Sequence, residues 1–153
     1  MIRVQEEDFD VGAEINKLTA GKSGIGGLAV FVGMVRDTAE GEDVRAMTLE
    51  HYPGMTEKKL KEIDAEAHKR WPLKATLVIH RYGELKPGER IVLVAAASSH
   101  RDAAFEACRF LIDWLKTQAP FWKLEDKGAK AEWVAARDSD AESAARWKSD
   151  KRG

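Results

Sequence analysis

The sequence has little of several things, and each shortage excludes a class of protein. It holds one cysteine, Cys108, which cannot form an internal disulfide and fits a reducing cytoplasm. No apolar run approaches the roughly 20 residues of a membrane-spanning helix, and the opening MIRVQEEDFD lacks a secretory pattern. An excess of charge of either sign is also lacking. The net charge of −1 argues against a protein that depends on sequence-independent nucleic-acid binding.

The histidines are few and are not spaced like metal ligands. They stand at positions 51, 68, 80 and 100, and a lone cysteine cannot complete a site with them. We therefore expect no structural zinc and no other bound metal.

Apolar residues are plentiful enough for one core. With 153 residues and 44% hydrophobic content, the chain is long enough to bury a sizeable interior. It has no internal repeats and no clear linker. We expect a single domain over residues 1–147 and a basic tail, residues 148–153, to which we assign no role.

Strand-like and helical segments alternate along the chain. Helices are expected at Asp10 to Leu18, at Thr56 (as the cap) to Trp71, and from Ser99 to just before Pro120. Strands are expected at Leu28 to Val35, Arg45 to Tyr52, Ala75 to Tyr82, Arg90 to Ala97, and in an extended segment from Phe121 to Val134. The first of these strands is apolar on both faces, which predicts a central, buried strand. Residues 37–43 are expected to form a polar loop, residues 83–88 a turn, and Trp147 an anchor.

The most informative stretch is Ser98 to Lys123, SSHRDAAFEACRFLIDWLKTQAPFWK. Ser99 precedes Asp102 by the spacing of a capping box, which predicts the start of a helix. His100 and Arg101 then lie on the first turn, where unpaired N–H groups and the helix dipole favour an anion. Arg101 suits a two-pronged contact with a phosphate or carboxylate. The alternative is a capped helix with solvated basic residues.

Three further cationic residues have both a functional and a purely structural interpretation. Arg36 lies at the exit of an apolar strand, where side chains emerge into clefts. Lys116 ends the amphipathic helix, and Lys123 adjoins Phe121 and Trp122. A lysine held against apolar surface loses solvation, so its pKa falls and it becomes a usable acid, base or nucleophile near neutral pH. The alternatives are that Lys116 complements the helix dipole and that the stem of Lys123 covers aromatic rings.

Five segments carry a family resemblance: LEHYPGMTE (Leu49 to Glu57), HRYGELKPGE (His80 to Glu89), SSHRDAAFEAC (Ser98 to Cys108), LKTQAPFWKLE (Leu115 to Glu125) and WVAARDSD (Trp133 to Asp140). Together they resemble the large, catalytic subunit of molybdopterin synthase, in the same order and with similar spacing. The resemblance runs from about Phe9 to Trp147, nearly the whole chain.

The resemblance implies an α+β fold, an α/β hammerhead with an additional antiparallel β-sheet. It implies a cytoplasmic sulfurtransferase of molybdenum cofactor biosynthesis that converts cyclic pyranopterin monophosphate into molybdopterin and needs no cofactor. The sulfur arrives on the C-terminal thiocarboxylate of a ubiquitin-like small subunit, and two sulfurs build the dithiolene. The large subunits form a homodimer with one small subunit at each end, a heterotetramer.

The resemblance also implies site residues. The substrate-binding positions are Met34, Val35, Arg36, His100, Arg101, Lys116, Lys123, Leu124, Glu125 and Arg137. Any contact at Met34 is assigned to its backbone, because some relatives carry a basic residue there. Arg36, His100 and Arg101 suit the phosphate, with charge-assisted hydrogen bonds of about 1.5–3 kcal/mol each. Lys116 and Lys123 are the catalytic candidates, which orient the thiocarboxylate and stabilise oxyanions, and one of them shuttles protons.

Competing interpretations rest on other residues. A persulfide mechanism would need Cys108, but this residue falls on the apolar stripe of Ala104, Leu111 and Leu115, which predicts a buried, unreactive thiol. A non-catalytic adaptor that binds the sulfur carrier is the main alternative function. A single-stranded RNA binder that uses Phe121 and nearby cations would lack a basic surface.

Helix geometry separates the expected site residues. His100 and Lys116 are sixteen residues apart on one expected helix, and a rise of about 1.5 Å per residue places them roughly 24 Å apart. One pterin phosphate does not easily span that distance. We therefore expect a pocket shared between two subunits, with His100 and Arg101 of one completing the site that holds Arg36, Lys116 and Lys123 of the other.

Overall fold

Two four-stranded sheets carry the fold in the computed structural model, which describes residues 1–39, 41–126, 131–134 and 144–147. The first sheet has the order β1 (Ile2–Gln5), β6 (Leu73–Arg81), β8 (Arg90–Ser98), β2 (Gly27–Met34). β1 runs parallel to β6, and the other neighbours are antiparallel. The second sheet is antiparallel throughout, in the order β10 (Ala131–Val134), β9 (Phe121–Asp126), β5 (Ala46–His51), β7 (Gly83–Leu85). The expected α+β fold with an additional antiparallel sheet is thereby confirmed.

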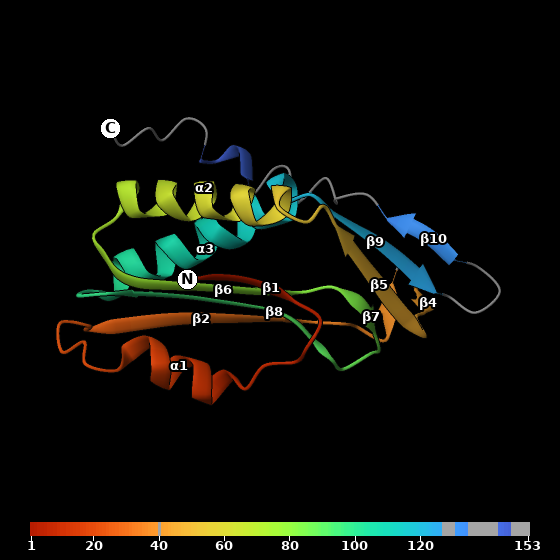
Figure 1. Cartoon of the computed structure of the whole chain (residues 1–153), viewed down its shortest axis with the longest axis horizontal. Coiled ribbons are helices and arrows are strands. Elements are labelled where there is room, and N and C mark those ends of the chain that lie inside the picture. Colours follow the sequence, from red (N-terminus) through yellow and green to blue (C-terminus); the bar gives the residue numbers. More distant parts are fainter. Residues whose placement is uncertain (40, 127–130, 135–143, 148–153) are drawn as a thin grey trace.

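Helices cover both faces of the first sheet (Figure 1). α2 (Met55–Arg70) and α3 (Arg101–Gln118) lie on one face, and α1 (Val11–Thr19) lies on the other. Each face has its own core. Leu60, Ala107 and Leu111 pack against Val78 and Val94 on the α2/α3 face. On the α1 face Leu18 packs with another set of strand residues, among them Leu77, Ile79, Leu93 and Ala95.

β2 lies at the edge of the first sheet, so the prediction of a central strand was wrong. Its only described partner strand is β8, and Gly27 stands opposite Ser98 while Met34 stands opposite Arg90. The strand is apolar on both faces because α3 covers one face and α1 the other. Apolar residues on both faces of a strand indicate that both faces are covered. They carry no information on the order of strands in the sheet.

Two segments that the sequence predicts to be a turn and a loop contain short strands. The expected turn at residues 83–88 contains β7, whose Leu85 pairs with Met47 and is fully buried. The expected polar loop at residues 37–43 contains a two-stranded ribbon of β3 (Thr38–Ala39) and β4 (Glu42–Asp43). Both segments are short, and their pairing depends on neighbours that local sequence does not reveal.

Helix boundaries agree with the expectations except at the N-terminal ends of α2 and α3. Asp10 caps α1 by accepting from the backbone N–H of Ala13, at 2.9 Å. The N-cap of α2 is Gly54, at φ 82°, and Thr56 lies inside the helix, fully buried. The Thr56 hydroxyl donates to the carbonyl of Tyr52 at 2.8 Å.

Trp147 is the anchor that the sequence predicts. Its side chain is 5% exposed, its ring contacts Trp71 and Phe110 at 5.6 Å between centroids, and its indole N–H donates to Asp113 at 2.8 Å. The segment near the C-terminus therefore closes the α2/α3 side of the core. The division between a domain at residues 1–147 and a tail stays a prediction, since residues 148–153 lie outside the described part. None of the described helices has the length and apolar character needed to cross a membrane.

Candidate functional site

Arg36 is placed by the residue before it. Val35 is 3% exposed and packs with Met47, Leu49 and Leu85 of the second sheet. Its backbone makes two hydrogen bonds of 2.9 Å, one to the carbonyl of Glu89 and one from the N–H of Gly88. Arg36 follows directly as an exposed side chain, at the junction of the two sheets.

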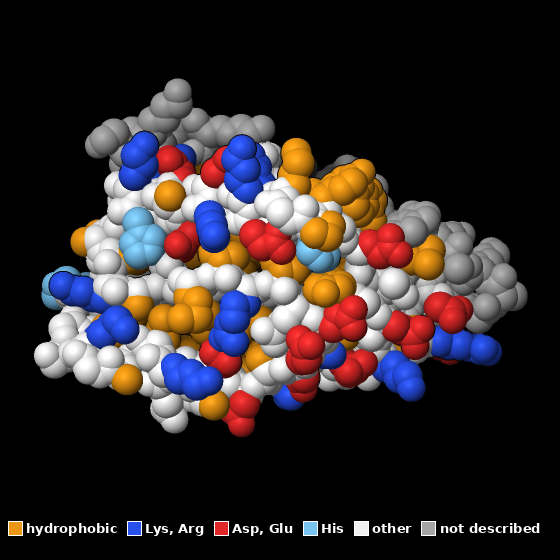
Figure 2. All heavy atoms as spheres, in the orientation of Figure 1, with side chains coloured by type: hydrophobic (Ala, Val, Ile, Leu, Met, Phe, Trp, Pro, Cys, Tyr) orange, Lys and Arg blue, Asp and Glu red, His pale blue; other side chains and the backbone are white. Residues whose placement is uncertain are grey.

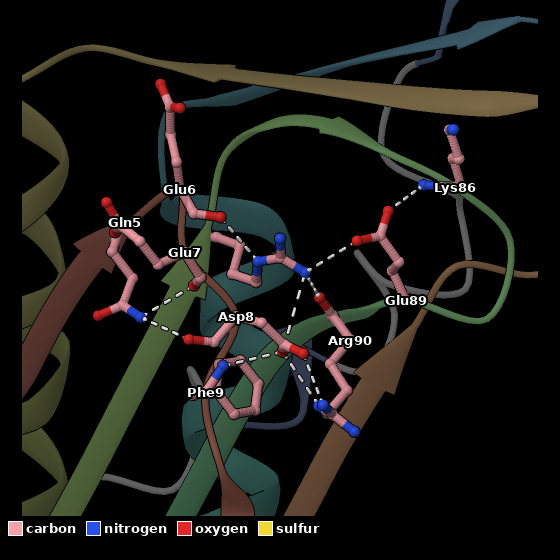
Figure 3. Close-up of polar contacts among 9 residues, drawn as sticks. Gln5, Glu6, Glu7, Asp8, Phe9, Lys86, Glu89 and Arg90 are labelled. Atoms are coloured by element: carbon pink, nitrogen blue, oxygen red, sulfur yellow. Dashed lines mark hydrogen bonds and ion pairs between the residues drawn. The ribbon is translucent and has the colours of Figure 1, made fainter.

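An ion-pair network holds the turn on which Val35 rests (Figure 3). The Arg81 guanidinium is largely buried and lies 3.6 Å from the Glu89 carboxylate and 3.9 Å from that of Asp8. It also donates to the carbonyls of Glu6 and Arg90, both at 2.9 Å. The hydrogen bond from Arg90 is the main reason that the pKa of Asp8 is lowered. The start of β8 is therefore fixed by charge, and through it the position of Arg36.

Lys123 lies on the face of the second sheet that covers Val35. It stands opposite Leu49, and directly opposed residues of an antiparallel pair share a face. Leu49 belongs to the same buried cluster as Val35. The Lys123 side chain is 40% exposed, and its Nζ lies 3.7 Å from a carboxylate oxygen of Glu125, which is almost fully buried. Lys123, Glu125 and Arg36 thus belong to one end of the molecule.

A cluster of rings around the buried His80 holds the start of β9, two residues before Lys123. The rings of His80 and Phe121 lie 3.7 Å apart between centroids at 17°. His51 contacts the same Phe121 ring at 5.9 Å and Tyr82 at 4.6 Å. Nδ1 of His80 donates to the carbonyl of Arg81 at 2.8 Å. Burial lowers the pKa of His80 to about 4, against the opposing effect of that carbonyl, and the charge of His51 lowers it further.

The sequence did not predict this cluster of rings. It indicated only that His80 and the other histidines lack the spacing of metal ligands. A signal was present, because His80 lies inside the apolar run of Ala75 to Tyr82. A histidine flanked by buried strand residues has to be held neutral and hydrogen-bonded.

Lys116 and Leu124 complete this end of the molecule. Lys116 is exposed in the last turn of α3, five residues before Phe121. Leu124 is half-buried and stands opposite Thr48 in β5. Met34, the last residue of β2, is 50% exposed.

His100 and Arg101 lie at the other end of the first sheet. α3 begins at Arg101, and His100 is its N-cap without a side-chain hydrogen bond in the described part of the chain. The predicted capping box of Ser99 with Asp102 was therefore wrong: the Ser99 hydroxyl instead donates to the carbonyl of Gly24 at 3.3 Å. His100 and Arg101 are both exposed beside backbone N–H groups of the first turn.

Glycines let the start of β2 pass close under the start of α3. A Cβ on Gly26 would stand 1.9 Å from the carbonyl oxygen of Ser99, so only glycine fits there. A Cβ on Gly27 would stand 3.3 Å from the Cα of Arg101. Arg101 is thereby fixed above the first residue of β2.

The expected site residues therefore form two groups within one chain. Arg36 and Lys116 lie at one end, and His100 and Arg101 at the other. α3 separates Arg101 from Lys116 by about 22 Å at its rise of about 1.5 Å per residue. β2 spans about 23 Å between its ends at about 3.3 Å per residue. Arg137 lies outside the described residues.

Cys108 is part of the core, as predicted. It is 6% exposed among residues of the α2/α3 face. Burial raises the pKa of its thiol to about 11, so almost none of it is thiolate near neutral pH.

An exposed apolar patch lies beside the Lys123 strand. Figure 2 shows hydrophobic side chains gathered near the start of α2. Tyr52, Met55 and Trp122 are 54%, 66% and 38% exposed, and the Tyr52 and Trp122 rings meet edge-on at 4.3 Å. Trp122 precedes Lys123 and therefore points to the opposite face of β9.

Comparisons with known proteins agree over most of the chain. The family model described as MoaE protein matches residues 4–118. The molybdopterin synthase catalytic subunit of Pseudomonas aeruginosa is 56% identical over 146 residues, which covers 95% of this chain and 97% of that protein. The solved structure of the molybdopterin biosynthesis MoaE protein from Burkholderia ambifaria has a TM-score of 0.84 at 50% identity, over 98% of this chain and 99% of that one. Molybdopterin synthase from Staphylococcus aureus has a TM-score of 0.81 at 29% identity, over 87% and 96%.

Proposed function

Because the chain belongs to the MoaE protein family, we propose that it is the catalytic subunit of a molybdopterin synthase and transfers sulfur to cyclic pyranopterin monophosphate. The sulfur comes from the C-terminal thiocarboxylate of a ubiquitin-like small subunit. The observation that carries the proposal is the grouping of Arg36, Lys123 and Lys116 at one end of a chain whose sequence matches this family over nearly its whole length. The cytoplasm remains the expected location.

The substrate needs cations, and the exposed ones at the two ends of the first sheet supply them. Arg36 offers a planar guanidinium for the cyclic phosphate, and its position is fixed through the buried Val35. His100 and Arg101 add donors at an N-terminus of α3 that no described side chain caps. Backbone N–H groups and the helix dipole favour an anion at that place.

The sulfur donor needs cations of another kind. A thiocarboxylate is an anion, and its acyl carbon passes through an oxyanion when the sulfur leaves. The ammonium groups of Lys123 and Lys116 stabilise both charges, and one of the lysines carries the proton. Glu125, 3.7 Å from the Lys123 ammonium, limits where that group can stand. Leu124 and the backbone of Met34 supply the uncharged wall of the site.

Two subunits are needed to assemble all of these groups. Within one chain, about 22 Å of helix separates Arg101 from Lys116. A pterin monophosphate does not reach across that distance. The site is therefore shared, with His100 and Arg101 of one subunit and Arg36, Lys116 and Lys123 of the other.

The small subunit requires a binding surface near Lys123. The exposed patch of Tyr52, Met55 and Trp122 suits this role, because aromatic residues and methionine are enriched in protein interfaces. It lies at the start of β9, so a partner seated there has a short path for its C-terminal residues around the strand to Lys123.

One reaction tests the proposal. The protein is mixed with a thiocarboxylated small subunit and cyclic pyranopterin monophosphate, and molybdopterin is measured. Product is expected, in step with loss of the thiocarboxylate. A complex that forms normally but yields no product would support the alternative of a non-catalytic adaptor and contradict our assignment.

A further inference from the structure

The end of β6 is the place where the chain passes from the first sheet to the second. β6 ends at Arg81, and β7 of the second sheet begins at Gly83, whose φ of 90° serves the turn between them. The last two residues of β6, His80 and Arg81, are only 6% and 7% exposed although both side chains are polar. Burial of polar groups costs free energy unless specific contacts hold them. The contacts of these two residues reach two different parts of the candidate site.

The ring of His80 joins the first sheet to the strand that carries Lys123. It stacks on the ring of Phe121 at 3.7 Å between centroids and 17° between planes. His51, which stands opposite Phe121 in β5, contacts the same ring at 5.9 Å. Phe121 and Lys123 lie two residues apart and therefore share a face of β9. The His80 ring thus fixes the start of the strand from which Lys123 projects.

The guanidinium of Arg81 acts on the segment that carries Arg36. It donates to the carbonyl of Arg90, the first residue of β8, at 2.9 Å, and it lies 3.6 Å from the carboxylate of Glu89. The carbonyl of Glu89 in turn accepts from the backbone N–H of Val35 at 2.9 Å. Because Val35 directly precedes Arg36, the Arg81 side chain holds the backbone from which Arg36 projects.

We propose that His80 and Arg81 are positioning residues for the candidate site. The ring of His80 sets where Lys123 stands, and the guanidinium of Arg81 sets where Arg36 stands. The proposal rests on the proposed function, which gives these two cations their roles. Successive side chains of a strand point to opposite faces, so one strand end holds both groups and fixes the spacing between them. Such spacing matters, because a displacement of about 1 Å at a reacting group can lower a rate about a hundred-fold.

The two positioning residues act on different kinetic constants. Lys123 serves the transfer of sulfur, so its displacement lowers kcat. Arg36 binds the phosphate before the reaction as well as during it, so its displacement raises the KM for the pyranopterin. A merely structural role of His80 or Arg81 would reduce the amount of folded protein and leave both constants of the folded protein unchanged.

Leucine and phenylalanine at position 80 separate the stacked ring from simple filling of space. Both side chains are apolar, and both remove the hydrogen bond that His80 donates to the carbonyl of Arg81. Only phenylalanine keeps a planar ring against Phe121. With folding checked by circular dichroism, we expect His80→Leu to lower kcat at least about ten-fold with little change in KM. The rescuing variant His80→Phe should keep kcat within about three-fold of the wild type.

Methionine at position 81 keeps the stem of the side chain and removes the guanidinium. We expect Arg81→Met to raise the KM for the pyranopterin at least about five-fold while kcat stays within about two-fold. Glu89→Gln removes the same ion pair from a carboxylate that is 42% exposed, so it should fold and shift KM in the same direction. The control is Arg3→Met, which removes the ion pair with Glu14 in the same sheet and should change neither constant.

Amide hydrogen exchange gives a readout that needs no activity. Peptides over residues 119–126 should exchange at least about three-fold faster in His80→Leu than in the wild type, and those over residues 33–37 should do so in Arg81→Met. In His80→Phe the exchange of residues 119–126 should match that of the wild type. Each variant therefore marks the segment that it releases.

These measurements separate the positioning roles from the proposed function. A folded His80→Leu protein with wild-type kcat, or a His80→Phe protein as impaired as His80→Leu, overturns the role of His80 while sulfur transfer by the wild type stands. An unchanged KM in both Arg81→Met and Glu89→Gln overturns the role of Arg81. A wild type that makes no molybdopterin contradicts the proposed function. In that case faster exchange confined to the expected segments supports the hold on Lys123 and Arg36, and unchanged exchange overturns it.

Discussion

Arg36 and Arg101 lie beyond opposite ends of one strand, β2, with Arg101 held above Gly27 and Arg36 two residues past Met34. Two arginines that suit the same anion are thereby kept apart in one chain by the whole of β2, which spans about 23 Å between its ends. This separation is the central fact for function, because it makes a second subunit part of the site.

The lysines should be needed for turnover. Lys123→Ala is expected to lower molybdopterin formation at least about ten-fold, the lower range for loss of a proton-transferring group. The side chain is 40% exposed, so fold and small-subunit binding should remain intact. Lys116→Ala should also impair turnover, whereas Lys61→Ala on the outer surface of α2 should not.

Lys123→Arg separates charge from proton transfer. Arginine stays protonated near neutral pH, so this variant should bind the thiocarboxylate yet fall short of the wild-type rate. Wild-type product formation by both alanine variants would remove Lys123 and Lys116 from the mechanism.

Cys108 should be dispensable for chemistry. Cys108→Ala leaves a small cavity and should cost about 1–2 kcal/mol of the free energy of unfolding. Sulfur transfer at the wild-type rate is expected, because the sulfur arrives on the partner's C-terminus. A well-folded Cys108→Ala protein without transfer activity would instead indicate a persulfide on this residue.

Gly26 should be intolerant of any side chain. Gly26→Ala places a Cβ 1.9 Å from the Ser99 carbonyl oxygen, so the start of α3 has to move and thermal stability should fall. Gly24→Ala is the matched control, because its Cβ would meet the end of the Lys74 side chain at 3.5 Å, an ordinary contact. Equal melting temperatures for the two variants would show that the close approach is not required.

His80 should make stability depend on pH. Its pKa in the folded state is about 4, lowered from 6.5 chiefly by burial. The unfolded chain therefore binds the proton first, and stability present above pH 6.5 is lost as the pH falls toward 4. This loss amounts to about 3 kcal/mol at about 1.4 kcal/mol per pKa unit.

His80→Phe keeps a ring against Phe121 and removes the titration. Urea unfolding between pH 7 and 4 should show a smaller decline of the unfolding free energy for this variant than for the wild type. Parallel declines would show that His80 is not the buried group responsible.

Much of the fold was predictable because local signals and burial agree. Leu60, Ile63 and Ala67 recur at helical spacing and are all buried, and the stripe through Cys108 is buried as expected. The place of β2 in the sheet was not predictable, because apolar faces report covering helices and strand order depends on distant pairing. The N-caps Gly54 of α2 and His100 of α3 were also not predicted. Serine and threonine side chains nearby had other partners, Ser99 the carbonyl of Gly24 and Thr56 that of Tyr52.

The site was predictable in membership but only partly in placement. Helix length alone separated His100 from Lys116, since the rise per residue is fixed. The side on which Lys123 lies depends on its pairing with Leu49, and the hold on Arg36 depends on the ion pairs around Arg81, which join distant segments. Sequence periodicity contains neither relationship.

Subunit mixing tests the shared site most directly. Arg101→Ala and Lys123→Ala proteins, each with strongly reduced activity alone, are combined under conditions that allow subunit exchange, and molybdopterin formation is measured with thiocarboxylated small subunit. Each mixed dimer should regain one intact site, with Arg101 from one chain and Lys123 from the other, so activity should return toward about a quarter of the wild-type level when half of the dimers are mixed. Proven exchange without recovered activity would contradict a site shared between two copies.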